Sequence, residues 1–198
     1  MVQPLAVAFD CDGVLADNGS SWQAIHDGFD TENKQMYAKF IAREIDDDEF
    51  MADDVAKWME ARGRIHKDDI ARCYGGIRLM PGAREVVGRL QERGIIVAII
   101  SSGVDIFVGM IAAMLKVDDW VANGFDWDED GWMNGPAPSR VLSFDKGVMV
   151  DKLMRINDLS SDQIVSVGDS GSDLSMMIKG SSFIGFNPAG TWSVDAFK

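Results

Sequence analysis

Two carboxylates stand one residue apart near the start of the chain, in the segment Phe9-Asp10-Cys11-Asp12-Gly13. The apolar run over residues 5–9 indicates a short buried strand that ends at this acidic pair. Ligands of open α/β sheets bind outside the carboxyl ends of the strands. Adjacent carboxylates repel each other and need a cation or a proton between them, and hard oxygen ligands favour Mg²⁺. The motif therefore predicts metal-assisted chemistry, and by itself it leaves a solvated turn open as the alternative.

Polar residues follow two further apolar segments in the same way. Residues 95–100 form a β-branched run that leads into Ser101-Ser102, with a helical pattern over residues 106–115 behind it. Residues 164–167 lead into the segment from Gly168 to Asp173. Parallel strands end at one edge of a sheet, so we expect the three polar segments to converge there. A strand, a polar turn and a helix N-terminus also offer backbone N–H groups to an anion.

Lys146, at the start of another helical pattern, adds a cation to this set. Carboxylates can hold a divalent metal, while a serine hydroxyl, turn amides and an ammonium neutralise the oxygens of a phosphoryl group. An aspartate carboxylate can itself be the nucleophile. The set therefore predicts phosphoryl transfer. Its members are Asp10, Asp12, Ser101, Ser102, Lys146, Asp169 and Asp173.

Length and composition limit the class of protein. The chain has 198 residues, enough for one domain or for a core with a small insertion, and its formal net charge is -13. Without a basic stripe, this charge argues against a nucleic-acid partner. We expect no signal peptide and no membrane span. One of the two cysteines lies inside the acidic motif, which favours a reducing compartment, and we expect the cytoplasm. The oligomeric state is left open.

Strand and helix patterns alternate along most of the chain, which predicts an α/β fold with a parallel sheet. Helical patterns alone fill residues 16–78, so we expect a small helical insertion there, with the core formed by residues 1–15 and 79–198. The acidic run over residues 46–49 is interpreted as a helix N-terminus rather than a metal site. The apolar residues behind Asp173, at 176–178, are expected to begin a helix.

The segment from Asp126 to Gly131 imitates the start of a calcium-binding loop, with acidic residues at alternate positions. The twelfth position is Ala137, where a bidentate Glu is needed. The flanking aromatic residues favour a β-hairpin with its turn at residues 129–131. We therefore interpret this segment as a hairpin.

In order and local context, the polar residues resemble the four motifs of the haloacid dehalogenase superfamily of phosphohydrolases. The motifs are Asp10-x-Asp12, Ser101 after an apolar strand, Lys146, and Gly168-Asp169-x-x-x-Asp173. The helical insertion after the first motif resembles the phosphoserine-phosphatase branch, and more loosely subfamily IB. The resemblance implies a Rossmann-like parallel-sheet core with a helical cap of the C1 type. It covers essentially the whole predicted core.

The resemblance also implies a role for each residue. Asp10 would attack phosphorus and carry the phosphoryl group as an aspartyl-phosphate. Asp12 would protonate the leaving alcohol, then activate water, and its backbone carbonyl would help to bind Mg²⁺. Asp169 would ligate Mg²⁺ together with Asp10, and Asp173 would support the metal or its waters. The phosphate-binding residues would be Ser101, Ser102 and Lys146, of which Lys146 would also steady Asp10.

Three departures from the branch make phosphoserine doubtful as the substrate. The Glu that reads the substrate amino group is missing, since Asn18-Gly19-Ser20 stands there. The cap Arg that reads the carboxylate has no clear counterpart, with Lys57 the nearest candidate, and Ser172 replaces an Asn. We therefore expect a small phosphorylated metabolite without naming it. A phosphotransferase and a non-catalytic protein that binds phosphate or Mg²⁺ are the alternatives.

The aromatic side chains of the insertion are expected to belong to its core rather than to a substrate surface, because they recur at helical spacing. They are Trp22, Phe29 and Trp58. His26 is expected to be packed or exposed, and His66 has no evident partner. The chain ends soon after Asn187-Pro188, early for the branch, so we expect a short or missing last element.

Overall fold

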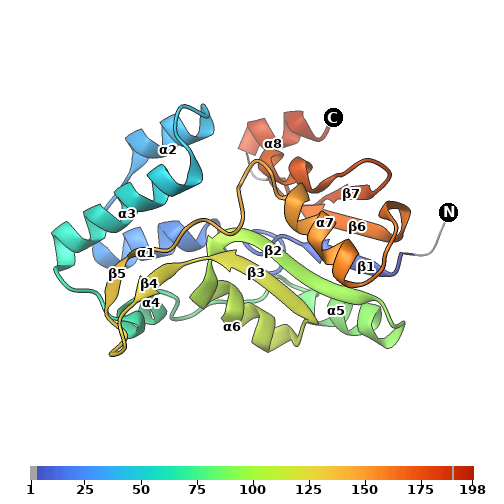
Figure 1. Cartoon of the computed structure of the whole chain (residues 1–198), viewed down its shortest axis with the longest axis horizontal. Coiled ribbons are helices and arrows are strands. Elements are labelled where there is room, and N and C mark those ends of the chain that lie inside the picture. The colour runs from blue at the N-terminus through green and yellow to red at the C-terminus, as the bar shows by residue number, and fades with distance from the viewer. Residues whose placement is uncertain (1–3, 189) are drawn as a thin grey trace.

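The computed structural model describes residues 4–188 and 190–198. Its centre is a five-stranded parallel sheet with the order β3-β2-β1-β6-β7 (Figure 1). The strands are β1 (Ala6–Phe9), β2 (Ile96–Val104), β3 (Asp119–Asn123), β6 (Ile164–Gly168) and β7 (Ser182–Gly185). The sheet confirms the predicted α/β class. The chain order reverses at the central strand β1, so the carboxyl ends of β2, β1 and β6 open at a topological switch point, where α/β folds bind ligands.

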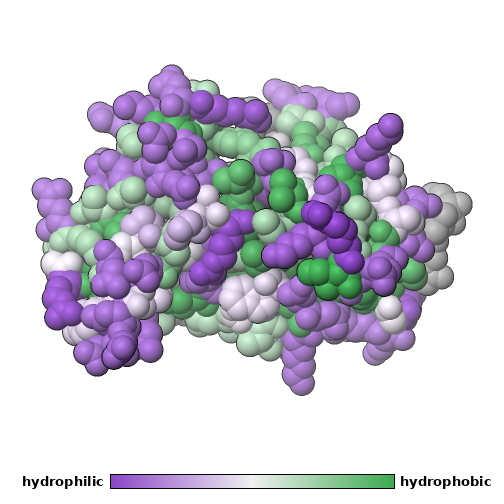
Figure 2. Space-filling view, in the orientation of Figure 1, coloured by the Kyte–Doolittle hydropathy of each residue, from purple (hydrophilic) through white to green (hydrophobic). Residues whose placement is uncertain are grey.

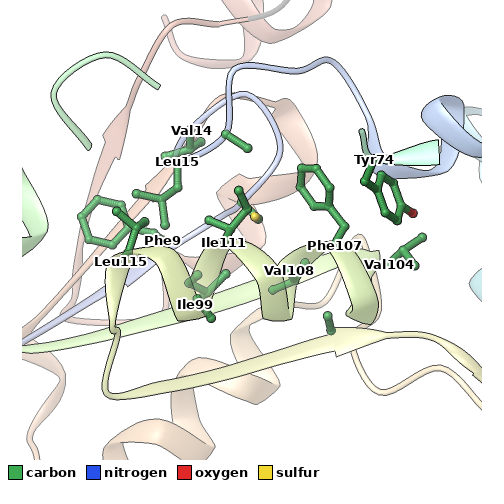
Figure 3. Packing of buried hydrophobic residues seen from close by; sticks show 14 of the residues in the cluster. Phe9, Val14, Leu15, Tyr74, Ile99, Val104, Phe107, Val108, Ile111 and Leu115 are labelled. Atoms are coloured by element: carbon green, nitrogen blue, oxygen red, sulfur yellow. The ribbon is translucent and has the colours of Figure 1, made fainter. Parts of the chain in front are cut away.

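Strand β1 is buried on both faces. Its alternate side chains point to opposite sides of the sheet. Val7 and Phe9 join the larger apolar cluster, which includes α6, whereas Ala6 and Ala8 join a smaller cluster that includes α7. Figure 3 shows Phe9 and Ile99 among the buried side chains around α6. Burial on both faces explains the continuous apolar run in the sequence. The helices around the sheet include α5 (Ala83–Glu92), α6 (Asp105–Leu115) and α7 (Gly147–Ile156).

Four helices lie between β1 and α5, as the periodicity of this segment predicts. They are α1 (Ser21–Phe29), α2 (Lys34–Ile41), α3 (Asp47–Arg62) and α4 (Lys67–Cys73). Helix α3 begins with a capping box, in which Asp46 accepts from the Glu49 N–H and Glu49 accepts from the Asp46 N–H. The acidic run therefore stabilises a helix N-terminus, which confirms that interpretation.

A two-stranded antiparallel hairpin packs against α3 and consists of β4 (Phe125–Trp127) and β5 (Met133–Pro136). The Asp128 carboxylate accepts hydrogen bonds from the backbone N–H groups of Asp130 and Trp132 in the turn. The hairpin prediction is confirmed, and this carboxylate is used to close the turn.

Two local predictions are wrong. Ser101, Ser102 and Gly103 do not form a turn, because β2 continues to Val104 with an irregular pairing to β3 and α6 begins at Asp105. The Val104 N–H, at the end of the extended strand, donates a hydrogen bond to Ser21 Oγ at 3.0 Å. Asp173 itself lies in a 3-10 helix, Gly171–Met176, and no α-helix begins at residue 176.

The chain continues past β7 into the helix α8 (Gly190–Ala196), which has seven residues and agrees with the short alternative for the last element. Figure 2 shows a notch between the α2–α3 pair and α8, with hydrophilic residues over much of the surface around it. Among the described residues, no helix has both the length and the apolar character needed to cross a membrane.

Candidate active site

Three strand ends meet as the sequence predicts. Asp10 directly follows β1, Ser101 lies in β2, and Asp169 directly follows β6. The Asp10 N–H donates to the Val167 carbonyl at 2.9 Å, which continues the β1–β6 pairing into the site. A cavity of about 810 Å³ lies over these ends and reaches to α1, α2 and α3. Its lining includes every residue of the predicted set, namely Asp10, Asp12, Ser101, Ser102, Lys146, Asp169 and Asp173.

Lys146 bridges two carboxylates at the floor of the cavity. Its side chain is buried, and Nζ donates to Oδ1 of Asp10 at 2.7 Å and to Oδ1 of Asp173 at 2.6 Å. Burial alone would lower the pKa of the Lys146 ammonium. Attraction to the two carboxylates outweighs this effect and raises the pKa, so the ammonium stays charged.

Asp173 also fixes the loop that carries Asp169. Its Oδ2 accepts from the backbone N–H groups of Asp169 and Ser170 and from Ser170 Oγ. Burial acts to raise the pKa of Asp173, but Lys146 and the Ser170 donors lower it below its usual value. A Cβ at Gly168 would lie 2.2 Å from that of Asp173, so the close approach requires glycine. Asp173 is therefore an ionised anchor of the site.

The carboxylates can hold a divalent cation. One oxygen each from Asp10, Asp169 and Asp173 lies within 4.8 Å of the others. Burial raises the pKa of Asp10 to about 8, although Lys146 opposes the shift. Burial and repulsion by Asp173 raise the pKa of Asp169 to about 7. A single ammonium thus does not offset the burial and mutual repulsion of the three carboxylates, and the all-oxygen donor set fits Mg²⁺.

Asp12 takes a different position from these three carboxylates. Its Oδ1 accepts from Asn18 Nδ2 at 2.7 Å, and its Oδ2 accepts from Ser21 Oγ at 2.8 Å. Burial raises the pKa of Asp12, although both hydrogen bonds act to lower it. A carboxyl group with a raised pKa suits proton transfer. Sequence reasoning missed these contacts of Asn18 and Ser21 with Asp12.

The two serines of β2 line the cavity together with Asp12. Ser101 is buried, and its Oγ accepts from the Gly103 N–H at 3.1 Å. The Ser102 carbonyl accepts from Trp22 Nε1 at 3.0 Å, which ties α1 to this strand end. A Cβ at Gly103 would lie 2.6 Å from Asp12 Oδ2, so glycine is needed where β2 passes the acidic motif. Both serines line the cavity and stay predicted phosphate ligands.

The insertion supplies the far wall of the cavity. Trp58 and Phe29 are buried in the core, as predicted, whereas Trp22 both stacks on Trp58 and lines the cavity. His26 is buried against Trp58, which confirms the packed alternative. Lys57 pairs with Asp53 at 3.7 Å and is not among the lining residues of the described chain. It therefore does not replace the missing cap Arg in this structure.

His66 has a partner that the sequence did not reveal. Its Nε2 lies 3.0 Å from the Asp130 carbonyl, and the residue caps α4. The contact joins the insertion to the β4–β5 hairpin, away from the cavity lining. We assign it a structural role.

Comparisons with known proteins agree with this arrangement. The model of the haloacid dehalogenase-like hydrolase family matches residues 7–177. A phosphoserine phosphatase of Methanocaldococcus jannaschii is 35% identical over 106 residues, which are 53% of this chain and 50% of that protein. A phosphoserine phosphatase of Archaeoglobus fulgidus is 30% identical over 134 residues, or 65% of this chain and 39% of that protein. The chain thus spans half or less of the length of these two relatives.

Solved structures share the architecture over most of the chain. A phospho-aspartyl intermediate analogue of phosphoserine phosphatase superposes with a TM-score of 0.77 at 25% identity, covering 94% of this chain and 88% of that one. A hydrolase of the same family from Salmonella enterica gives a TM-score of 0.80 at 16% identity, covering 96% and 65%, and shows the fold alone. Because the family match spans most of the sequence, the chain belongs to the haloacid dehalogenase-like hydrolase family.

Proposed function

We propose that the protein is a Mg²⁺-dependent phosphatase that hydrolyses a small phosphomonoester, with Asp10 as the nucleophile. The observation that carries the proposal is the buried Lys146 ammonium, which contacts Asp10 in the cavity that Asp12 and Asp169 also line. The similarity to phosphoserine phosphatases, one of them solved as a phospho-aspartyl intermediate analogue, supports the same reaction class.

In the first step an oxygen of Asp10 forms a bond to phosphorus, and the bond from phosphorus to the alcohol oxygen breaks. Asp12 gives its proton to the departing alcohol, so the leaving group is neutral. Asp12 then takes a proton from water, whose oxygen attacks phosphorus and releases inorganic phosphate from Asp10. Asn18 and Ser21 hold the Asp12 carboxylate during both proton transfers.

Charge in this site is balanced by the residues around Asp10. Lys146 favours the ionised form of Asp10 and orients it, and Ser101 and Ser102 bind phosphate oxygens. Asp10, Asp169, Asp173 and the Asp12 carbonyl would hold the metal. When bound, Mg²⁺ supplies positive charge that screens the phosphate from the carboxylates.

Residues 16–78 are proposed to act as a cap over a core formed by residues 1–15 and 79–198. Helices α1, α2 and α3 of this segment line the side of the cavity opposite the strand ends. Closure over a substrate would exclude water from the first step.

The test is release of phosphate from an aryl phosphate with Mg²⁺ and then with a chelator. We expect turnover that stops when the metal is removed and that Asp10→Asn abolishes, because an amide is a poor nucleophile of the same size. Asp151→Asn, at an exposed position of α7, is the matched control and should behave like the parent protein. Asp10→Asn activity within tenfold of the parent would exclude the covalent step. Transfer of phosphate to an added alcohol would instead identify a phosphotransferase.

A further inference from the structure

Asp54, from helix α3, is a buried carboxylate in the wall of the same cavity. Its Oδ1 accepts from Asn33 Nδ2 at 2.6 Å and lies 3.0 Å from His26 Nε2. Its Oδ2 is buried and has no hydrogen-bond partner among the described residues. Leaving a buried carboxylate oxygen without a donor is costly, so this atom requires an explanation.

The neighbouring histidine does not neutralise Asp54. The Trp58 indole N–H can only donate, and it lies 3.1 Å from His26 Nδ1, so Nδ1 must accept. Thr31 Oγ1, 2.8 Å from the same nitrogen, can donate its hydroxyl proton to it as well. The ring proton is therefore assigned to Nε2, which donates to Asp54 Oδ1. His26 is then a neutral imidazole that holds Asp54 in place without cancelling its charge.

The lysines of the described lining are both paired with other acidic residues, Lys146 with Asp10 and Asp173. Lys34 is the basic residue of this wall, and it is exposed and paired with Glu32 at 2.6 Å. Asp47, also in the wall, is satisfied by the N–H and Oγ of Ser143. The acidic residues of the wall away from the strand ends are Asp27, Glu32, Asp47 and Asp54. A substrate carboxylate would meet like charge here, whereas an ammonium would supply both charge and donors.

We propose that Asp54 binds the part of the substrate away from the phosphate. The substrate is then a phosphomonoester of an amino alcohol without a carboxylate. The inference rests on the proposed phosphatase function. The ammonium donates to Oδ2 of Asp54 while the phosphate lies at Asp10 and Lys146. Asp54, Asp10 and Lys146 all line the same cavity, and its volume of about 810 Å³ falls within the range of small-molecule sites. The buried carboxylate thereby gains its missing partner, and phosphoserine is disfavoured.

The test compares phosphomonoesters of matched size in the presence of Mg²⁺. Aminoethyl and aminopropyl phosphate carry the ammonium, hydroxyethyl phosphate replaces it with a neutral group, and phosphoserine adds a carboxylate. We expect kcat/KM for the better amino ester to exceed that for hydroxyethyl phosphate and for phosphoserine by about tenfold or more, as a charge-assisted contact implies. In Asp54→Asn the ratio of kcat/KM for the amino ester to kcat/KM for the hydroxy ester should fall to about one. Both esters are measured on the same preparation, so the fraction of folded enzyme cancels in this ratio.

Glu60→Gln, at an exposed position of the same helix outside the cavity lining, is the matched control and should keep the parent ratio. Binding to Asp10→Asn, measured by calorimetry, reads the same contact without turnover. Tighter binding of the better amino ester than of hydroxyethyl phosphate, by about tenfold, would support the proposal even if no ester were hydrolysed. Equal binding or equal turnover of the two, or a preference for phosphoserine, would overturn the role of Asp54. Failure to hydrolyse any ester counts against the phosphatase function alone.

Discussion

The Lys146 ammonium donates a 2.7 Å hydrogen bond to the Asp10 carboxylate, across 136 positions of the chain. Both side chains are almost fully buried, so little solvent screens the contact, and Asp173 shares the ammonium. Buried charges are tolerated only when each has its partner, because an isolated ion in the interior costs several kcal/mol. Lys146 is therefore expected to stabilise the folded protein through the same contact that orients Asp10.

Lys146→Met should destabilise the protein strongly. It keeps the length of the side chain and removes its charge, which leaves Asp10 and Asp173 without their cation. We expect the free energy of unfolding to fall by about 3–5 kcal/mol, measured by urea denaturation with a chelator present. Lys152→Met, at an exposed position of α7, is the matched control and should change stability little. A loss below about 1 kcal/mol for Lys146→Met would contradict the buried-pair argument.

Stability without metal should decrease as the pH rises. The pKa of Asp10 is about 8 and that of Asp169 about 7 in the folded chain, both above the ordinary 3.8. Between the ordinary pKa and the raised pKa of each carboxyl group, the folded state binds more protons than the unfolded state. The stability that these protons contribute is complete at low pH and is lost as the two carboxyl groups ionise in the folded chain. We expect the free energy of unfolding to drop by at least about 1 kcal/mol from pH 5 to pH 8.5, measured by urea denaturation with a chelator.

The variant Asp10→Asn is the control for this pH dependence, since it removes the group with the larger shift. Its stability profile should be flatter than that of the parent chain. A parent profile that stays level or rises over this pH range would show that the two carboxylates are not protonated in the folded protein.

Added Mg²⁺ should raise the melting temperature, and the shift should grow with pH as the metal replaces protons at the carboxylates. Asp169→Asn should weaken the metal-dependent shift by at least half, because it removes one charged ligand. Asp162→Asn, in the short helix Ser161–Gln163 outside the cavity lining, should leave the shift as it is in the parent. Differential scanning fluorimetry gives this readout without turnover. An unchanged shift in Asp169→Asn would place the metal elsewhere.

Ser21→Ala should impair the position of Asp12. Ser21 Oγ donates to Asp12 and accepts from the Val104 N–H, so the variant breaks two hydrogen bonds. We expect a loss of about 1–3 kcal/mol in stability. The Ser21 hydrogen bond lowers the pKa of Asp12, so its loss should raise that pKa and move the Asp12-dependent limb of the kcat profile to higher pH. Ser21→Thr, which keeps the hydroxyl, should restore the parent profile, and a limb that does not move in Ser21→Ala would make the role structural only.

Some features of the protein follow from local sequence. The apolar run before Asp10 forms a strand because both faces of β1 are covered, and Asp169 follows a strand for the same reason. Parallel strands end at one edge, so the convergence of Asp10, Ser101 and Asp169 could be predicted without coordinates. The roles implied for these residues, and the division into cap and core, stay predictions.

Other features depended on partners far away in the chain. Asp54 appears in the sequence as one acid on a helix, and only the fold places His26, 28 positions away, against it and leaves Oδ2 without a donor. The last residue of β2, Val104, likewise donates its N–H to Ser21, which lies 83 positions away in the chain. Local patterns report the period of apolar residues, so they define an element and its buried face. They carry no information on which polar group of another element will contact a given side chain. These long-range contacts determine the hydrogen bonds of the site.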